Sequence, residues 1–202
     1  MRNRSVLAIT ILASSLAPLY GAAQPIIDNE RVRIWDVTFN PADPAPLPHH
    51  DHDFVTVWLS GAADGSHKKG DVVVLKSGDT KLKPGERTVI IELKDHAVAP
   101  LVNKTGYPNA FPRPRSEKVF ENDRLIVWRY AFRPGEPSPM HFHDKDAVPI
   151  YMEPTDLKST TPEGVVTEND YKLFEVRFSP RNRTHTELLV HGTGSAIITE
   201  LK

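Results

Sequence analysis

The sequence predicts an all-β protein built from two related, strand-rich units. The first observation is an internal repeat, because residues 29–59 align without a gap on residues 122–152 at a constant offset of 93. Eleven of the 31 aligned positions are identical. The second observation is that apolar and polar residues alternate along the chain, with no helical periodicity after the first residues. The third is the presence of 18 prolines, most of them between the candidate strands, where they disfavour helices.

The repeated segment has the same order of features in both copies. Each copy contains a strand, a proline-rich turn and a His/Asp cluster that leads into a second strand. The identical pairs are Asn29/Asn122, Arg31/Arg124, Trp35/Trp128, Phe39/Phe132, Pro41/Pro134, Pro44/Pro137, Pro46/Pro139, His50/His143, Asp51/Asp144, Asp53/Asp146 and Val55/Val148. We therefore predict an internal duplication, with the two tryptophans filling equivalent core positions.

Residues 1–23 are predicted to be a signal peptide. Arg2 and Arg4 precede an apolar run over 6–17, and small residues follow at 21–23, where a signal peptidase cleaves. The rival interpretation, a membrane anchor, is disfavoured because crossing a bilayer takes about 20 apolar residues. The mature protein is therefore expected in the periplasm or the secreted space, with no membrane association after cleavage.

The mature chain is expected to divide into a first β-barrel at 24–106, a proline-rich linker at 107–116 and a second β-barrel at 117–202. Apart from the repeated segment itself, the candidate strands lie at 71–75, 88–93, 173–178, 187–191 and 196–201. Because small barrels or sandwiches can share strands, the two units need not be independent.

Charge and composition exclude several function classes. Loss of the leader, with two arginines and no acidic residue, changes the formal net charge from −1 to −3. Since no basic stripe is present, nucleic acids and anionic membranes are not expected partners. The absence of cysteine excludes disulfides, thiolate ligands and a cysteine nucleophile. No phosphate-binding loop, nucleophile elbow or metalloprotease helix motif occurs.

The histidines of the second copy carry the strongest chemical signal. His141 and His143 are two residues apart, so on a strand they face the same side. His185 opens a later candidate strand, and Glu187 would share its face. Imidazole nitrogens with a carboxylate oxygen suit a divalent transition metal, namely Fe, Mn, Ni or Zn. The preferred metal site is therefore His141, His143, His185 and Glu187.

These residues resemble the cupin superfamily, and a two-domain bicupin in particular. The first cupin motif is His-x-His followed after three or four residues by Glu, and the second is Pro-x-Gly-x-x-His. His141-x-His143 and Pro180-x-Asn182-x-x-His185 match in type and spacing. The motifs are degenerate, because Ala147 and Val148 stand where the glutamate is expected, Asn182 replaces the glycine, and Leu189 stands where the second motif often ends in Asn.

The resemblance implies two RmlC-like jelly-roll barrels of the double-stranded β-helix type, a bound metal, a small-molecule ligand and a possible homodimer. Asp146 is a weaker substitute for the missing glutamate than Glu187, because its strand parity is wrong unless a bulge intervenes. A less favoured metal site in the first barrel consists of His50, His52 and His96.

Each feature also has a plainer interpretation. The His/Asp cluster of the first copy is also consistent with a solvated turn, and the histidines of the second copy with remnants of a lost site. The basic group Arg177, Arg181 and Arg183 suits either an anionic substrate such as a carboxylate or a solvated strand end.

Two functions follow from these observations. The first is an exported metal-binding bicupin, acting as an oxygenase, decarboxylase or isomerase on a small organic molecule. The alternative is a non-catalytic cupin that binds a small ligand or sugar, or serves as a scaffold. The sequence identifies no catalytic residue, and whether the protein is an enzyme stays open.

Overall fold

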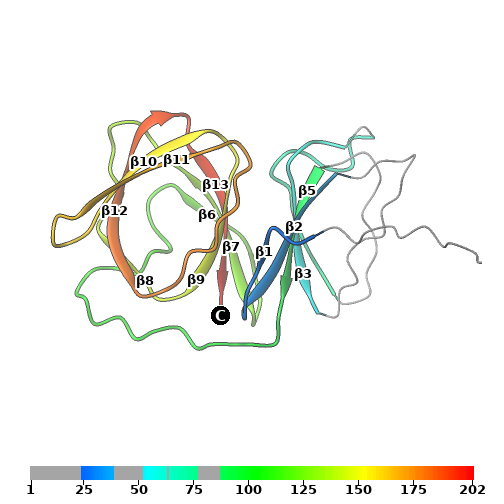
Figure 1. Ribbon diagram of the computed structural model, residues 1–202, viewed down its shortest axis with the longest axis horizontal. Helices are drawn as coiled ribbons and strands as arrows, with labels where there is room; N and C mark the ends of the chain where they lie inside the picture. The colour runs from blue at the N-terminus through cyan, green and yellow to red at the C-terminus, as the bar shows by residue number, and fades with distance from the viewer. Residues whose placement is uncertain (1–23, 39–51, 63, 77–86) are drawn as a thin grey trace, which may run out of the picture.

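Three antiparallel sheets make up the part of the chain that the structure describes (Figure 1). The computed structural model describes residues 24–38, 52–62, 64–76 and 87–202, so the predicted signal peptide lies outside it. Its strands confirm the all-β prediction. Within these residues no helix has the length and apolarity needed to cross a membrane.

The first half of the chain forms a single five-stranded sheet of order β1-β2-β5-β3-β4. Its strands are β1 (Ile27–Asp28), β2 (Val32–Thr38), β3 (Phe54–Trp58), β4 (Val72–Leu75) and β5 (Arg87–Leu93). The sequence predicts a closed barrel here, but over the described residues this half contributes no second sheet.

The second half of the chain forms two four-stranded sheets that enclose a barrel. One sheet has the order β6-β7-β13-β9 and the other β11-β10-β12-β8. The strands are β6 (Ser116–Glu121), β7 (Leu125–Ala131), β8 (His141–His143), β9 (Asp146–Tyr151), β10 (Thr155–Thr160), β11 (Val166–Tyr171), β12 (Arg183–Gly192) and β13 (Ser195–Leu201). Apolar side chains from both sheets, such as Trp128, Leu157 and Leu189, form one buried cluster between them.

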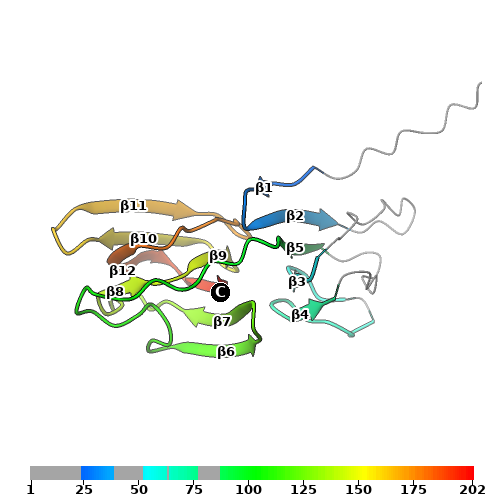
Figure 2. The same cartoon turned by 90° about the horizontal axis from the view of Figure 1, so that it is seen from below.

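A second core joins the first sheet to the outside of the barrel, as the side-by-side halves in Figures 1 and 2 show. Ten of its buried side chains are five pairs that lie 93 positions apart. The pairs are Val32/Leu125, Ile34/Val127, Val55/Val148, Val57/Ile150 and Leu59/Met152. The two sheets therefore contact each other through equivalent faces. Because successive side chains of a strand point to opposite faces, the two tryptophans lie on the faces turned away from this core. Trp128 packs inside the barrel, and Trp35 packs in a separate small cluster.

The strand order of the first sheet repeats in the barrel. The order β1-β2-β5-β3 matches β6-β7-β13-β9, with β2 and β7 exactly one repeat apart. Both copies enter this sheet through the same asparagine turn. The Asn29 Oδ1 accepts hydrogen bonds from the backbone of residues 31 and 32, and the Asn122 Oδ1 accepts them from residues 124 and 125, all at 2.8–3.0 Å.

Two arginines at repeat-equivalent positions link the halves reciprocally. Arg31 donates to the carbonyl of Lys202, just beyond β13, at 3.2 Å. Arg124 donates to the carbonyl of Lys94, just beyond β5, at 2.7 Å. Because β5 and β13 hold the same place in their sheets, these two contacts mirror each other, as contacts do across a two-fold axis.

The prediction of a strand at 173–178 is wrong. Phe174 has a φ of 65°, in the left-handed region that no strand residue adopts, and the segment contributes only isolated bridges such as Ile150–Val176. In contrast, β6, β10 and β11 were not predicted. Strand β11 has the sequence VTENDY, and its residues are mostly exposed. It therefore lacks the alternation of apolar and polar residues on which strand prediction depends.

Candidate metal centre

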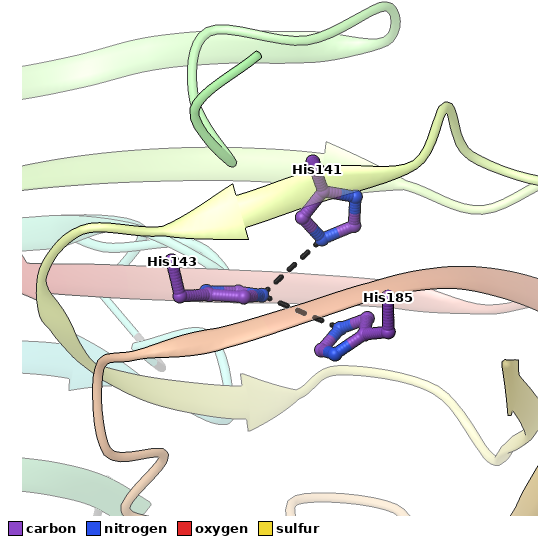
Figure 3. A group of neighbouring side chains, drawn as sticks. All are labelled: His141, His143 and His185. Atoms are coloured by element: carbon purple, nitrogen blue, oxygen red, sulfur yellow. Dashed lines mark hydrogen bonds between the residues drawn. The ribbon is translucent and has the colours of Figure 1, made fainter. Parts of the chain in front are cut away.

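The three histidines of the second copy are brought together by two neighbouring strands. Strand β8 pairs with the start of β12, and in this register His141 lies opposite His185 while His143 lies opposite Arg183. Since alternate residues of a strand share a face, all three imidazoles project to the same side (Figure 3). All three side chains are at least nine-tenths buried.

The turn before β12 explains why asparagine replaces the glycine of the cupin motif. Asn182 has a φ of 66°, and asparagine is among the few residues with a side chain that adopt this left-handed conformation readily. Its backbone N–H donates to the carbonyl of His143 at 2.8 Å. The turn that delivers His185 to the cluster is therefore preserved despite the substitution.

The spacing of the ring nitrogens matches that of ligands to one ion. The Nε2 of His143 lies 3.2 Å from the Nε2 of His141 and 3.3 Å from the Nε2 of His185. Two nitrogens bound at about 2.1 Å to one metal ion are about 3.0 Å apart at a right angle and about 3.4 Å apart at the tetrahedral angle. Among the described residues, these histidines are the group whose ligand atoms lie close enough to hold a metal.

The ring of His141 turns its unprotonated nitrogen toward the cluster. Its Nδ1 lies 2.8 Å from the carbonyl oxygen of Pro139, so Nδ1 carries the proton and donates to this carbonyl. The Nε2 atom is then unprotonated, as in metal-ligating histidines that donate their other ring N–H to a backbone carbonyl.

Burial keeps two of the imidazoles neutral at pH 7. Burial, aided by the nearby Arg113 charge, lowers the pKa of His141 to about 4. Burial, followed by the charge of Arg183, also lowers the pKa of His143 well below its usual value. Because a metal needs the neutral imidazole, both rings are in the ligating form without having to lose a proton.

Arg113 is the residue of this site that sequence reasoning missed. It lies in the segment predicted as a linker at 107–116. This segment runs beside β8, because Ala110 N–H donates to the carbonyl of Phe142 and Phe142 N–H donates to the carbonyl of Pro108. The Arg113 Nη1 donates to the Nε2 of His141 at 2.7 Å. Its guanidinium lies 4.0 Å from the ring centroid of Tyr130, inside the barrel. No motif in the proline-rich segment signals that an arginine would be buried here.

Glu187 adjoins the cluster but is engaged by Arg113. Its Oε2 accepts a hydrogen bond from Arg113 Nη2 at 3.0 Å, and its Oε1 lies 3.7 Å from the Nε2 of His185. Burial alone would raise the pKa of Glu187, but Arg113 and His185 outweigh it and hold this pKa well below its usual range. Glu187 is therefore an anion beside the three histidines. The weaker candidate, Asp146, instead accepts hydrogen bonds from Arg31 and from the backbone of Arg181.

The residues considered for a site in the first barrel do not gather in the described part of the chain. His50 lies outside the described residues. His52 contacts Glu92 at 3.4 Å through Nδ1 and Asp95 at 3.2 Å through Nε2, while His96 is exposed. No group of three possible ligands among the described residues includes either histidine.

A cavity of about 740 Å³ gives access to the cluster from within the barrel. His143, His185 and Glu187 line it, and Ala147, where the cupin motif expects glutamate, forms part of the same wall. Tyr151 and Tyr171, stacked at 3.9 Å between ring centroids, also face the cavity. This volume is typical of small-molecule sites.

Comparison with known proteins finds cupins among solved structures. A cupin domain from Bordetella pertussis Tohama I is 22% identical, with a TM-score of 0.37, over 48% of this chain and 94% of that one. A cupin 2 conserved barrel domain protein from Leptotrichia buccalis is 12% identical, with a TM-score of 0.43, over 89% of this chain and 88% of that one. The polyketide cyclase RemF from Streptomyces resistomycificus is 17% identical, with a TM-score of 0.36, over 52% of this chain and 80% of that one. No protein-family model matches the chain, and no curated protein does.

Proposed function

We propose that this chain is an exported, metal-binding bicupin whose second barrel holds a divalent transition metal, Fe, Mn, Ni or Zn, and acts on a small organic molecule. The observation that carries this proposal is the convergence of three buried imidazole nitrogens at 3.2–3.3 Å. The ligands are His141, His143 and His185. Three protein ligands leave coordination positions open to a substrate in the adjoining cavity.

The remaining residues of the site have separable tasks. A bound metal supplies Lewis acidity, which suits oxygenation, decarboxylation or isomerisation of a substrate oxygen function. The Glu187 carboxylate, kept ionised by Arg113 and His185, is placed to accept a proton from a group in the cavity. Ala147 and Phe132 add apolar surface to the lining of the same cavity.

The role proposed for the first sheet is that of a duplicated partner. Its support is the repeated strand order, the five paired core positions, the twin asparagine turns and the mirrored arginine contacts. In this proposal the first unit has kept the frame of a barrel half. It covers the outer face of the sheet β6-β7-β13-β9, which lies across the barrel from the strands that carry the histidines.

A second candidate function is supported by the position of Arg113. Its guanidinium already uses the His141 lone pair that a metal ion would need, at 2.7 Å. In a non-catalytic protein that binds a small ligand or sugar, this internal cation replaces the metal and holds the histidines and Glu187 in place.

The deciding experiment is metal analysis of the purified protein, followed by titration of the chelator-treated protein with Fe, Mn, Ni and Zn ions. We expect one ion per chain, bound tightly enough to survive gel filtration. Failure of all four metals to bind rejects the metal-dependent function and leaves the second candidate. The intact mass of the same preparation reports whether residues 1–23 have been removed.

Replacing Arg113 separates the two candidates further. We expect Arg113→Met to raise metal affinity at least about tenfold, because a guanidinium a few ångströms from a dication repels it strongly at low dielectric. Isothermal titration of the chelator-treated variant checks this expectation. Arg115→Met is the matched control, since Arg115 pairs with Glu136 outside the site. If metal binds the Arg113→Met variant but not the unmodified chain, Arg113 is the cation that occupies the site in place of a metal. If the variant binds metal more weakly than the unmodified chain, Arg113 supports the metal ligands.

A further inference from the structure

Of the three arginines in the basic group at 177–183, only one has its charge available inside the barrel. Arg177 forms an ion pair with Glu175 at 2.5 Å, and Arg181 donates to the carbonyl of Ala99 at 2.7 Å. Neither of these residues lines the cavity, whereas Arg183 does. The structure therefore separates this group, which the sequence treats as a single cluster, into two surface residues and one cavity residue.

One nitrogen of the Arg183 guanidinium is hydrogen-bonded within the chain, and the two terminal nitrogens are available to a ligand. Its Nε donates to the carbonyl of Pro180 in the turn before β12 at 2.6 Å. Its two terminal nitrogens have no hydrogen bond or ion pair with any residue in the described ranges. A half-buried cation with two free, parallel N–H groups is the geometry that binds a carboxylate in a bidentate manner.

Other charges near the cavity do not cancel this cation. The Glu187 carboxylate attracts Arg183 through space, but its ion pair is with Arg113, at 3.0 Å. Glu163 also lines the cavity, but it is exposed to solvent, where its field is screened. The phenol groups of Tyr151 and Tyr171 are neutral, because burial raises the pKa of both.

The strand register sets how far this cation lies from the histidines. Arg183 is directly opposite His143 and two residues before His185 on β12. Two residues of a strand span about 6.8 Å. A molecule that reaches from the guanidinium to the three Nε2 atoms is therefore short, with its carboxylate and a second oxygen separated by only a few bonds.

We propose that the cavity binds a small organic acid whose carboxylate pairs with Arg183, while a hydroxyl or carbonyl oxygen of the same molecule faces His143 and His185. The stacked pair Tyr151 and Tyr171 contacts the body of this acid. The orientation toward the histidines rests on the proposed metal function, but the pairing of Arg183 with the carboxylate does not require a metal.

The test is calorimetric titration with salicylate and pyruvate, using salicylamide as the uncharged match of salicylate. Both the chelator-treated and the Zn-loaded protein are titrated. We expect at least one of the acids to bind the unmodified chain. The Arg183→Gln variant should bind this acid at least tenfold more weakly in both forms. Salicylamide should bind the unmodified chain no more tightly than the acid binds the variant. Arg181→Gln is the matched control and should bind as the unmodified chain does, because the Arg181 guanidinium donates to Ala99 and does not line the cavity. Thermal melts confirm that each variant is folded.

The outcomes distinguish this inference from the metal proposal. If none of the four metals binds but the acid still depends on Arg183, the metal proposal fails and the carboxylate site stands. If zinc strengthens acid binding but Arg183→Gln does not weaken it, the metal proposal stands and this inference is overturned. Failure of both acids to bind either form also overturns it, as does an equal loss in Arg181→Gln.

Discussion

Replacing His143 with alanine is expected to abolish stoichiometric metal binding, with a loss in affinity of at least about 100-fold. His143 is the central ligand, since its Nε2 lies within 3.3 Å of the other two. Even partners that only orient a ligating histidine are worth about 10- to 100-fold in affinity, so loss of a ligand itself costs at least as much. Competition against a chromogenic chelator measures the change.

The matched control is His191→Ala, because His191 lies on the same strand as His185 but is exposed. This variant should retain the affinity of the unmodified chain. His143→Phe keeps the buried volume, so it separates loss of a ligand from loss of folding. Retention of metal by a folded His143→Phe protein would place the ion elsewhere and refute the three-histidine site.

Replacing Arg31 with methionine is expected to destabilise the protein by about 3 kcal/mol or more. The Arg31 Nη1 donates to the Oδ2 of Asp146 at 2.6 Å, and both side chains are about nine-tenths buried at the junction of the two halves. Removing one partner of a buried ion pair leaves the other charge buried without compensation, which costs about 3–5 kcal/mol. Urea unfolding at pH 7 measures the loss.

Arg133 supplies the control for this experiment. It pairs with Glu136 through side chains that are 65% and 55% exposed. An exposed pair of this kind contributes at most about 1 kcal/mol, so Arg133→Met should cost far less. A double variant, Arg31→Met with Asp146→Leu, should recover part of the lost stability. Equal losses in the two single variants would show that the junction does not depend on the buried pair.

The part of the site that sequence could predict is the part governed by strand parity. His141 and His143 are two residues apart, and His185 follows a turn whose proline and left-handed residue are both visible in the chain. Arg113 was not predictable in this way. Its approach to His141 depends on a segment without regular structure, which is positioned by backbone hydrogen bonds to β8.

The limits of the fold prediction have a similar cause. The strands β2 and β7 are easily recognised because they are rich in apolar residues. One face of each packs in the core between the halves, and the other face packs in a second apolar cluster. The wall formed by β10 and β11 is polar, with residues such as Ser159 and Asn169 facing the cavity, so hydrophobic patterning misses it. Likewise, among the described residues the second face of the first sheet buries the cluster of Trp35, Phe54, Leu75 and Ile90, which is small for the closed barrel expected there.

The mirrored contacts of Arg31 and Arg124 have a consequence for how the protein behaves on dilution. On the proposed duplication, a single-unit ancestor would have covered this sheet by associating with a second copy, and that association would have weakened on dilution. In the present chain the covering sheet is tethered, so its local concentration is set by the connecting segment and not by the number of molecules. The barrel that carries the histidines thus keeps its covering sheet even when the protein is dilute.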